Sequence, residues 1–122
     1  MLQAVPGLHI KVGLAYVQNR LDRYEVLLQK FFASSVNDLT RLSEAVASDD
    51  RAGIAAAAHS LRGAAAVVGA TTVEAAAQAV ETAIRQRCSG DELKRVIRAL
   101  EESRAALASA VGAVATPTPA AQ

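Results

Sequence analysis

The fold of this 122-residue chain is decided by one stretch, His59-Ser60-Leu61-Arg62-Gly63-Ala64-Ala65-Ala66-Val67-Val68-Gly69-Ala70. Its apolar positions recur in steps of three and four, the spacing of a buried helical stripe. Each helical residue turns by about 100°, so His59 lies roughly 160° around the helix from Leu61. The stretch therefore predicts a helix whose outer face carries the histidine. The residues of the stripe are Ile54, Ala57, Ala58, Leu61, Ala65 and Val68.

Gly63 is the residue that an Ala-rich helix explains least. A glycine inside a helix costs about 0.5–1 kcal/mol relative to alanine. His59, Arg62 and Gly63 stand at positions i, i+3 and i+4, so they share one helical face. The glycine leaves room beside the imidazole for a partner's backbone or a phosphoryl group, and Arg62 supplies charge for an anion.

These residues resemble the sequence pattern of histidine-containing phosphotransfer (Hpt) domains. The pattern is His, any residue, Leu, Lys or Arg, Gly, any residue, Ala, three residues, Gly and a small residue. The chain meets it with His59, Leu61, Arg62, Gly63, Ala65, Gly69 and Ala70. Lysine is the commoner residue at the Arg62 position. A second likeness, to Hpt modules at the C-terminal end of hybrid sensor kinases, rests on Gly13-Leu14, Tyr24, Leu27-Leu28 and Phe31.

Composition favours a single all-α domain. Hydrophobic residues make up 52% of the chain but aromatic residues only 3%, and much of the apolar content is alanine. A net charge of +1 without a large basic block argues against nucleic-acid binding. The apolar runs are too short to span a membrane, and Met1–Ile10 shows no secretory signal. A single cysteine, Cys88, excludes an internal disulfide, so we expect a cytoplasmic protein.

The helical patterns predict an antiparallel four-helix bundle with a short additional N-terminal helix. We expect residues 1–111 to form the domain and residues 112–122, rich in Ala, Thr and Pro, to be a disordered tail. One long helix or two should cover the region before Ser48. A monomer is expected, because the exposed site must admit a partner.

Several side chains are assigned within these helices. The N-terminal helix, residues 8–17, should turn Leu8, Val12, Ala15 and Tyr16 inward. Helix ends are predicted at Asp49 or Asp50, at Gly69, and at two capping boxes, Thr71–Glu74 and Ser89–Glu92. The last helix should bury Leu93, Val96, Ile97, Leu100, Leu107 and Val111, with Arg95, Arg98 and Arg104 on a mostly solvated face.

The resemblance implies a role for each site residue. His59 would be the phosphoacceptor, Arg62 would stabilise phosphate charge, and Gly63 would give steric access. The short connection at residues 69–71 favours an antiparallel next helix, which brings Glu81 and Arg85 to the level of His59 or slightly beyond. In the family a polar residue at the first position contacts the histidine and a cation at the second can assist the phosphate. Glu81 and Arg85 can also pair with each other.

The predicted function is that of a phosphorelay intermediate, which the resemblance implies. His59 would accept a phosphoryl group from a receiver-domain aspartyl phosphate and pass it to another receiver aspartate. The chain shows no ATP-binding loop and no carboxylate set with an evident Mg²⁺ spacing, so we expect a phosphotransfer protein that does not phosphorylate itself from ATP. No cofactor of its own is expected, and the receiver would supply Mg²⁺. The domain could stand alone or be part of a hybrid sensor histidine kinase.

Two other classes of function are open on the sequence. A non-catalytic helical adaptor or dimerisation module would explain the helices equally well, but not Gly63. A hydrolase or metalloenzyme would need paired carboxylates, a second nearby histidine or a nucleophile–base couple, and the sequence offers none of these.

Overall fold

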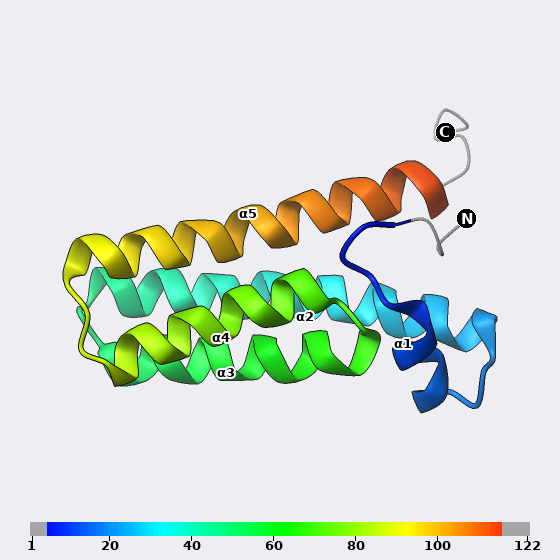
Figure 1. Ribbon diagram of the computed structural model, residues 1–122, viewed down its shortest axis with the longest axis horizontal. Helices are drawn as coiled ribbons and strands as arrows, with labels where there is room; N and C mark the ends of the chain where they lie inside the picture. Colours follow the sequence, from blue (N-terminus) through cyan, green and yellow to red (C-terminus); the bar gives the residue numbers. More distant parts are fainter. Residues whose placement is uncertain (1–4, 116–122) are drawn as a thin grey trace.

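The computed structural model describes residues 5–115, with side chains through Gly112. Within this range the chain forms four long antiparallel helices and one short helix across an end of the bundle (Figure 1). The predicted all-α four-helix bundle with a short N-terminal helix is thus confirmed. The helices are α1 (Ile10–Tyr16), α2 (Leu21–Ala47), α3 (Arg51–Val68), α4 (Thr71–Arg85) and α5 (Gly90–Ala115).

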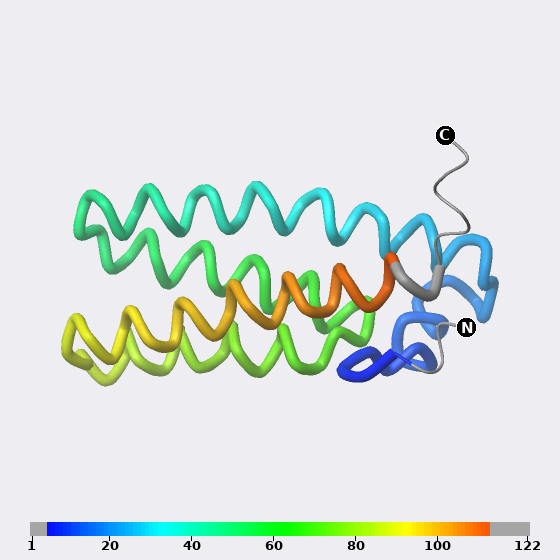
Figure 2. Tube along the Cα trace, turned by 90° about the horizontal axis from the view of Figure 1, so that it is seen from above, coloured from blue at the N-terminus to red at the C-terminus, as the bar shows by residue number. Residues whose placement is uncertain are grey.

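Neighbouring helices follow one another along the chain. The most extensive contacts join α2 to α3, α3 to α4 and α4 to α5, and α2 forms one edge of the bundle (Figure 2). Arg104 of α5 reaches back to α2, where it donates to Ser35 Oγ at 2.8 Å and to the Phe32 carbonyl at 3.0 Å. The prediction that Arg104 belongs to a solvated face was therefore wrong, because its guanidinium satisfies buried Ser35.

The core follows the predicted stripes closely. All six inward positions predicted for α5 are buried, and so is the whole stripe of α3. Alanines on the facing sides of α3 and α4, among them Ala65 and Ala77, are fully buried. Small residues let these two helices approach closely, which matters because α3 and α4 carry the site residues.

The N-terminal helix is turned differently from the prediction. Val12, Ala15 and Tyr16 are exposed, whereas Ile10 and Gly13 are buried. A Cβ on Gly13 would lie 2.1 Å from the Tyr24 ring, so only a glycine lets α1 pack this closely on α2. The pattern of apolar residues did not reveal this because the inward position is the one without a side chain.

Backbone hydrogen bonds hold the N-terminal segment on the α3–α4 turn. The His9 N–H donates to the Gly69 carbonyl at 2.7 Å, and the Thr71 N–H donates to the Gly7 carbonyl at 2.9 Å. Gly69 ends α3 with φ of 80°, as predicted. The Thr71–Glu74 capping box was wrong: no side chain caps α4, because the Thr71 hydroxyl donates to Gly7 instead.

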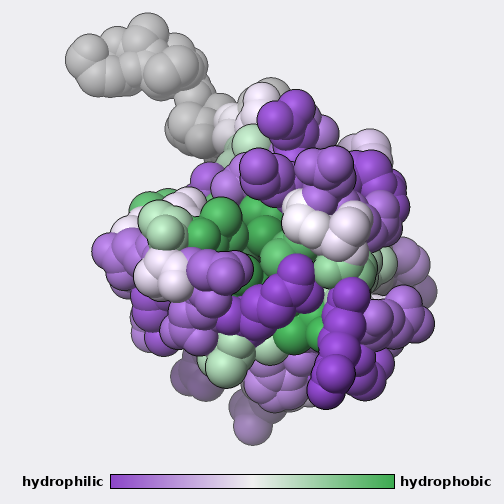
Figure 3. Space-filling model, turned by 90° about the vertical axis from the view of Figure 1, so that its left-hand side faces the viewer, coloured by the Kyte–Doolittle hydropathy of each residue, from purple (hydrophilic) through white to green (hydrophobic). Residues whose placement is uncertain are grey.

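Polar residues close the opposite end of the bundle. The Asp50 side chain caps α3 by accepting from the Gly53 N–H at 2.9 Å, and the Ser89 hydroxyl accepts from the Glu92 N–H at 3.1 Å. Arg51 joins the two connections at this end by donating to the Cys88 carbonyl at 3.0 Å. Figure 3 looks onto this end and shows apolar side chains in the middle, ringed by polar ones.

The last helix runs further than the sequence suggested. It passes through Gly112 to Ala115, and the rest of the expected tail, residues 116–122, lies outside the described residues. None of the helices in the described range has the length and apolar character needed to span a membrane.

Candidate functional site

His59 lies on the outer face of α3, on the opposite side from the buried stripe. Its side chain is 67% exposed, whereas Leu61, two positions on, is fully buried. The sequence-based placement of the imidazole on the surface of the bundle agrees with this geometry. A visiting protein can therefore reach the ring without any rearrangement of the helices.

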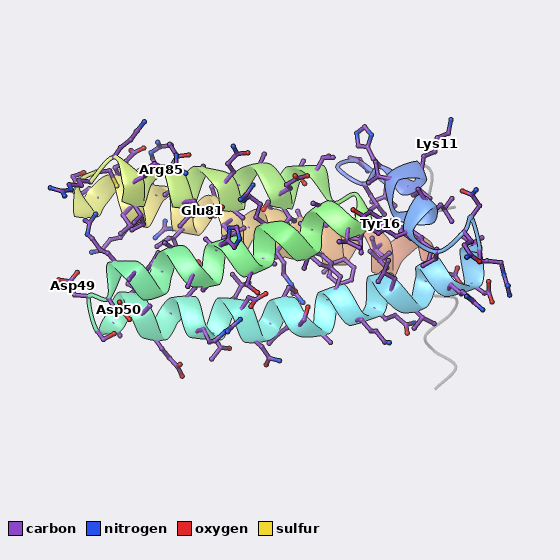
Figure 4. All side chains as sticks on the ribbon, turned by 90° about the horizontal axis from the view of Figure 1, so that it is seen from below. Lys11, Tyr16, Asp49, Asp50, Glu81 and Arg85 are labelled. Atoms are coloured by element: carbon purple, nitrogen blue, oxygen red, sulfur yellow. The ribbon has the colours of Figure 1, made fainter. Side chains whose placement is uncertain are left out.

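Glu81 of α4 contacts the ring of His59. One carboxylate oxygen, Oε2, lies 2.9 Å from His59 Nδ1, and the other, Oε1, lies 2.5 Å from Nε of Arg62. Figure 4 labels Glu81 on α4, the helix that runs beside α3. The side chain of Glu81 is only 14% exposed, so one largely buried glutamate binds two side chains of α3.

This contact fixes the chemistry of the imidazole. An ionised carboxylate only accepts hydrogen bonds, so in contact with it His59 Nδ1 carries a proton and donates a hydrogen bond to Glu81. In the neutral imidazole the other ring nitrogen, Nε2, then carries no proton. An NH2 nitrogen of Arg62 lies 3.2 Å from the same Nδ1, but guanidinium accepts no hydrogen bond, so that contact places a positive charge beside the ring.

Gly63 lies one helical turn after His59 on the same face of α3 and is exposed. A Cβ built on it would find no atom within 4 Å apart from its own helix and chain neighbours. Packing inside the chain therefore does not require a glycine here, in contrast to Gly13. The absence of a side chain lowers the surface next to His59, and the role of Gly63 in access stays a prediction.

Arg85 lies one helical turn beyond Glu81 on α4 and is exposed (Figure 4). It forms no side-chain hydrogen bond or ion pair with the residues that the structure describes. The possible pair between Glu81 and Arg85 is not formed, because both oxygens of Glu81 are taken by α3. The structure thus brings His59, Arg62 and Glu81 together and leaves Arg85 unpaired beside them.

The ion pair between Arg62 and Glu81 was missed by the sequence analysis. Arg62 was assigned only to an incoming anion, although opposite charges on facing sides of two antiparallel helices were already visible. No set of three or more His, Cys, Asp or Glu in the described part of the chain could hold a metal ion.

The model of the Hpt domain family matches residues 26–112. The chain belongs to this family, whose members transfer phosphoryl groups through histidine in two-component signalling and are not kinase catalytic domains.

A solved structure shares the fold. The Hpt domain of a hybrid sensor histidine kinase from Shewanella matches with a TM-score of 0.65, covering 90% of this chain and 97% of that one. The identity is 17%, so this likeness concerns the fold alone. A comparison with curated proteins gave no match.

Proposed function

We propose that His59 is the phosphoacceptor of a phosphorelay, taking a phosphoryl group from a receiver-domain aspartyl phosphate and passing it to another receiver aspartate. The observation that carries this proposal is the exposed imidazole whose Nδ1 is bound to Glu81 at 2.9 Å. That contact leaves Nε2 as the nucleophile on the open side of the ring.

The phosphoryl transfer needs no separate general base, because no proton has to leave the ring. The lone pair of Nε2 attacks phosphorus, a nitrogen–phosphorus bond forms, and the bond from phosphorus to the aspartyl oxygen breaks to regenerate the carboxylate. The ring becomes positively charged because Nδ1 keeps its proton. Glu81 stabilises that charge through the hydrogen bond that it already accepts, and the reverse reaction follows the same path.

Cations around the ring would offset the charge of the phosphoryl group. Arg62 lies next to the imidazole, and Arg85 is unpaired one turn along α4. In this proposal the receiver supplies Mg²⁺ together with the acceptor aspartate, as the family resemblance implies. Gly63 would let that active site close over the ring.

The partner class follows from the family. Hpt domains of hybrid sensor kinases, such as the Shewanella relative, imply receiver domains as partners. A receiver must fit its phosphorylated aspartate over His59. The nearby small side chains of α3, including exposed Ala56 and Gly63, offer a low surface for this approach.

The chain contains its own control for the test. His9 is also exposed and makes no side-chain capping bond at the start of α1. We would mix the protein with a phosphorylated receiver and follow base-stable, acid-labile label in the wild type, in His59→Gln and in His9→Gln. Label on the wild type and on His9→Gln, but not on His59→Gln, is expected. Label retained on His59→Gln, or receiver binding without label, would refute the proposal, and the latter would favour an adaptor.

A further inference from the structure

The outer face of α2 is unusual for a helix that faces solvent. Seven consecutive positions in steps of three and four are all exposed and all uncharged. Each follows a buried residue of α2 by one or two positions, which places it about 100–200° from the core. We call this surface the outer α2 face. It consists of Val26, Gln29, Ala33, Val36, Thr40, Ser43 and Ala47.

Large apolar side chains that are exposed to solvent are concentrated on this helix. Val26, Val36 and Val46 are 49%, 50% and 38% exposed, and the half-buried Phe32 and Leu39 pack against the core nearby. Water-facing helix surfaces normally carry charge. Among the charged residues of α2, Asp22 continues this row at its N-terminal end and Asp38 lies in the interior, whereas the others lie beside the outer face.

The charges beside the outer α2 face determine which partner fits. Lys30, Asn37 and Glu44 follow one another at intervals of seven along one flank. If a second α2 packs antiparallel, with Asn37 facing its own copy, each Lys30 faces the Glu44 of the other chain. A parallel arrangement would place the two copies of this flank on opposite sides of the seam, so Lys30 and Glu44 would not meet. The flank is therefore self-complementary for a two-fold axis across α2.

We propose that the outer α2 face is a self-association surface, occupied by the same face of a second copy in antiparallel orientation. The same register sets Val36 against Thr40 and Ala33 against Ser43 of the partner copy, so valine faces small residues. The expected monomer rested on the need to keep the site open. Helix α2 forms an edge of the bundle (Figure 2) and Glu81 is on α4, so a dimer through α2 leaves both His59 rings accessible.

Sedimentation measurements can test the association of the purified chain. A single helix seam lies at the small end of interface sizes, so we expect a reversible dimer with Kd on the order of 100 µM. Val36→Lys should raise Kd at least tenfold, because it places two charges near the axis. Val12→Lys changes an equally exposed valine on α1 and should have no effect. A wild type that stays monomeric up to about 1 mM, as it would if another protein occupied this face, would overturn the proposal.

The orientation is tested by reversing charges. Lys30→Glu alone and Glu44→Lys alone should each weaken self-association about fivefold, because each creates two like-charge pairs. An equimolar mixture of these two variants should associate as well as the wild type, since every Glu then faces a Lys. Single variants as strong as the wild type would rule out the antiparallel pairing, and a mixture that stays weak would show that these flanks do not meet.

Discussion

At Gly63, a larger residue is expected to increase thermal stability but to slow phosphoryl transfer. An added Cβ meets nothing inside the chain, and alanine in a helix is about 0.5–1 kcal/mol better than glycine. We expect Gly63→Ala to raise the thermal unfolding midpoint by a few degrees. The same methyl group would stand where a receiver must approach, so the rate of phosphoryl transfer should fall several-fold, and Gly63→Leu should lower it further.

Gly112 provides the matched control. It is also helical and open, with nothing within 4 Å of an added Cβ, but it lies in the last turns of α5. Gly112→Ala should stabilise the fold slightly and leave the transfer rate unchanged. If Gly63→Ala transferred phosphate as fast as Gly112→Ala, the steric role assigned to Gly63 would be wrong.

The buried hydroxyl of Tyr24 makes the free energy of unfolding depend on pH in the alkaline range. Its hydroxyl is buried and donates to the Val68 carbonyl at 2.8 Å, a group at the end of α3 that would otherwise lack a partner. Burial raises the pKa of Tyr24 from 10 to about 12. The native state therefore binds the proton more tightly, so this contribution is complete below pH 10 and is lost as the pH rises towards 12.

We expect Tyr24→Phe to cost about 1–2 kcal/mol at neutral pH, because the Val68 carbonyl loses its donor. The variant should also lose less stability than the wild type between pH 10 and 12. Urea midpoints at pH 8 and pH 11 for both proteins would measure the two effects. Parallel pH profiles would mean that Tyr24 ionises in the native state as it does in the unfolded chain.

At the scale of the elements, the α3–α4 turn has a strongly constrained backbone. Gly69 has φ of 80°, and a Cβ there would lie 2.1 Å from the His9 carbonyl oxygen. Gly69→Ala therefore combines backbone strain with a clash against the N-terminal segment, and we expect it to cost more than 1–2 kcal/mol. Faster amide exchange at His9 and Thr71 would show that the segment has separated from the turn. Unchanged protection at both amides would contradict this account.

What could be predicted from sequence depended on the kind of contact. The stripes of α3 and α5 were correct, because apolar spacing along one helix reports directly which face is buried. The orientation of α1 was wrong, because its packing depends on Gly13 meeting Tyr24, a contact between distant residues made by a missing side chain. The short turn placed Glu81 at the level of His59, and the family resemblance implied the contact between them. That Glu81 also binds Arg62 could be seen only in the structure.

For the whole molecule, the partner's footprint should extend beyond the histidine. A specific interface covers about 800 Å² on each partner, much more than one ring and its small neighbours. We expect this footprint to extend along α3 from His59 to the end of the bundle where α1 packs, and Tyr16 is exposed there (Figure 4). Val12, also on α1, is exposed as well. Exposed aromatic and aliphatic groups next to a binding site commonly contribute to docking.

Tyr16→Ala should therefore raise the receiver concentration needed for half-maximal transfer about fivefold, without changing the rate at saturation, because Tyr16 is remote from the reacting nitrogen. Val46→Ala serves as the control. Val46 follows Phe32 by two heptads on α2, and Phe32 meets Arg104 of α5, so Val46 faces the α5 side, away from this footprint. Receiver titrations with phosphorylated label would separate the two parameters. A lower rate at saturation would mean that Tyr16 affects the chemistry of His59, and no change in either parameter would limit the docking surface to α3 and α4.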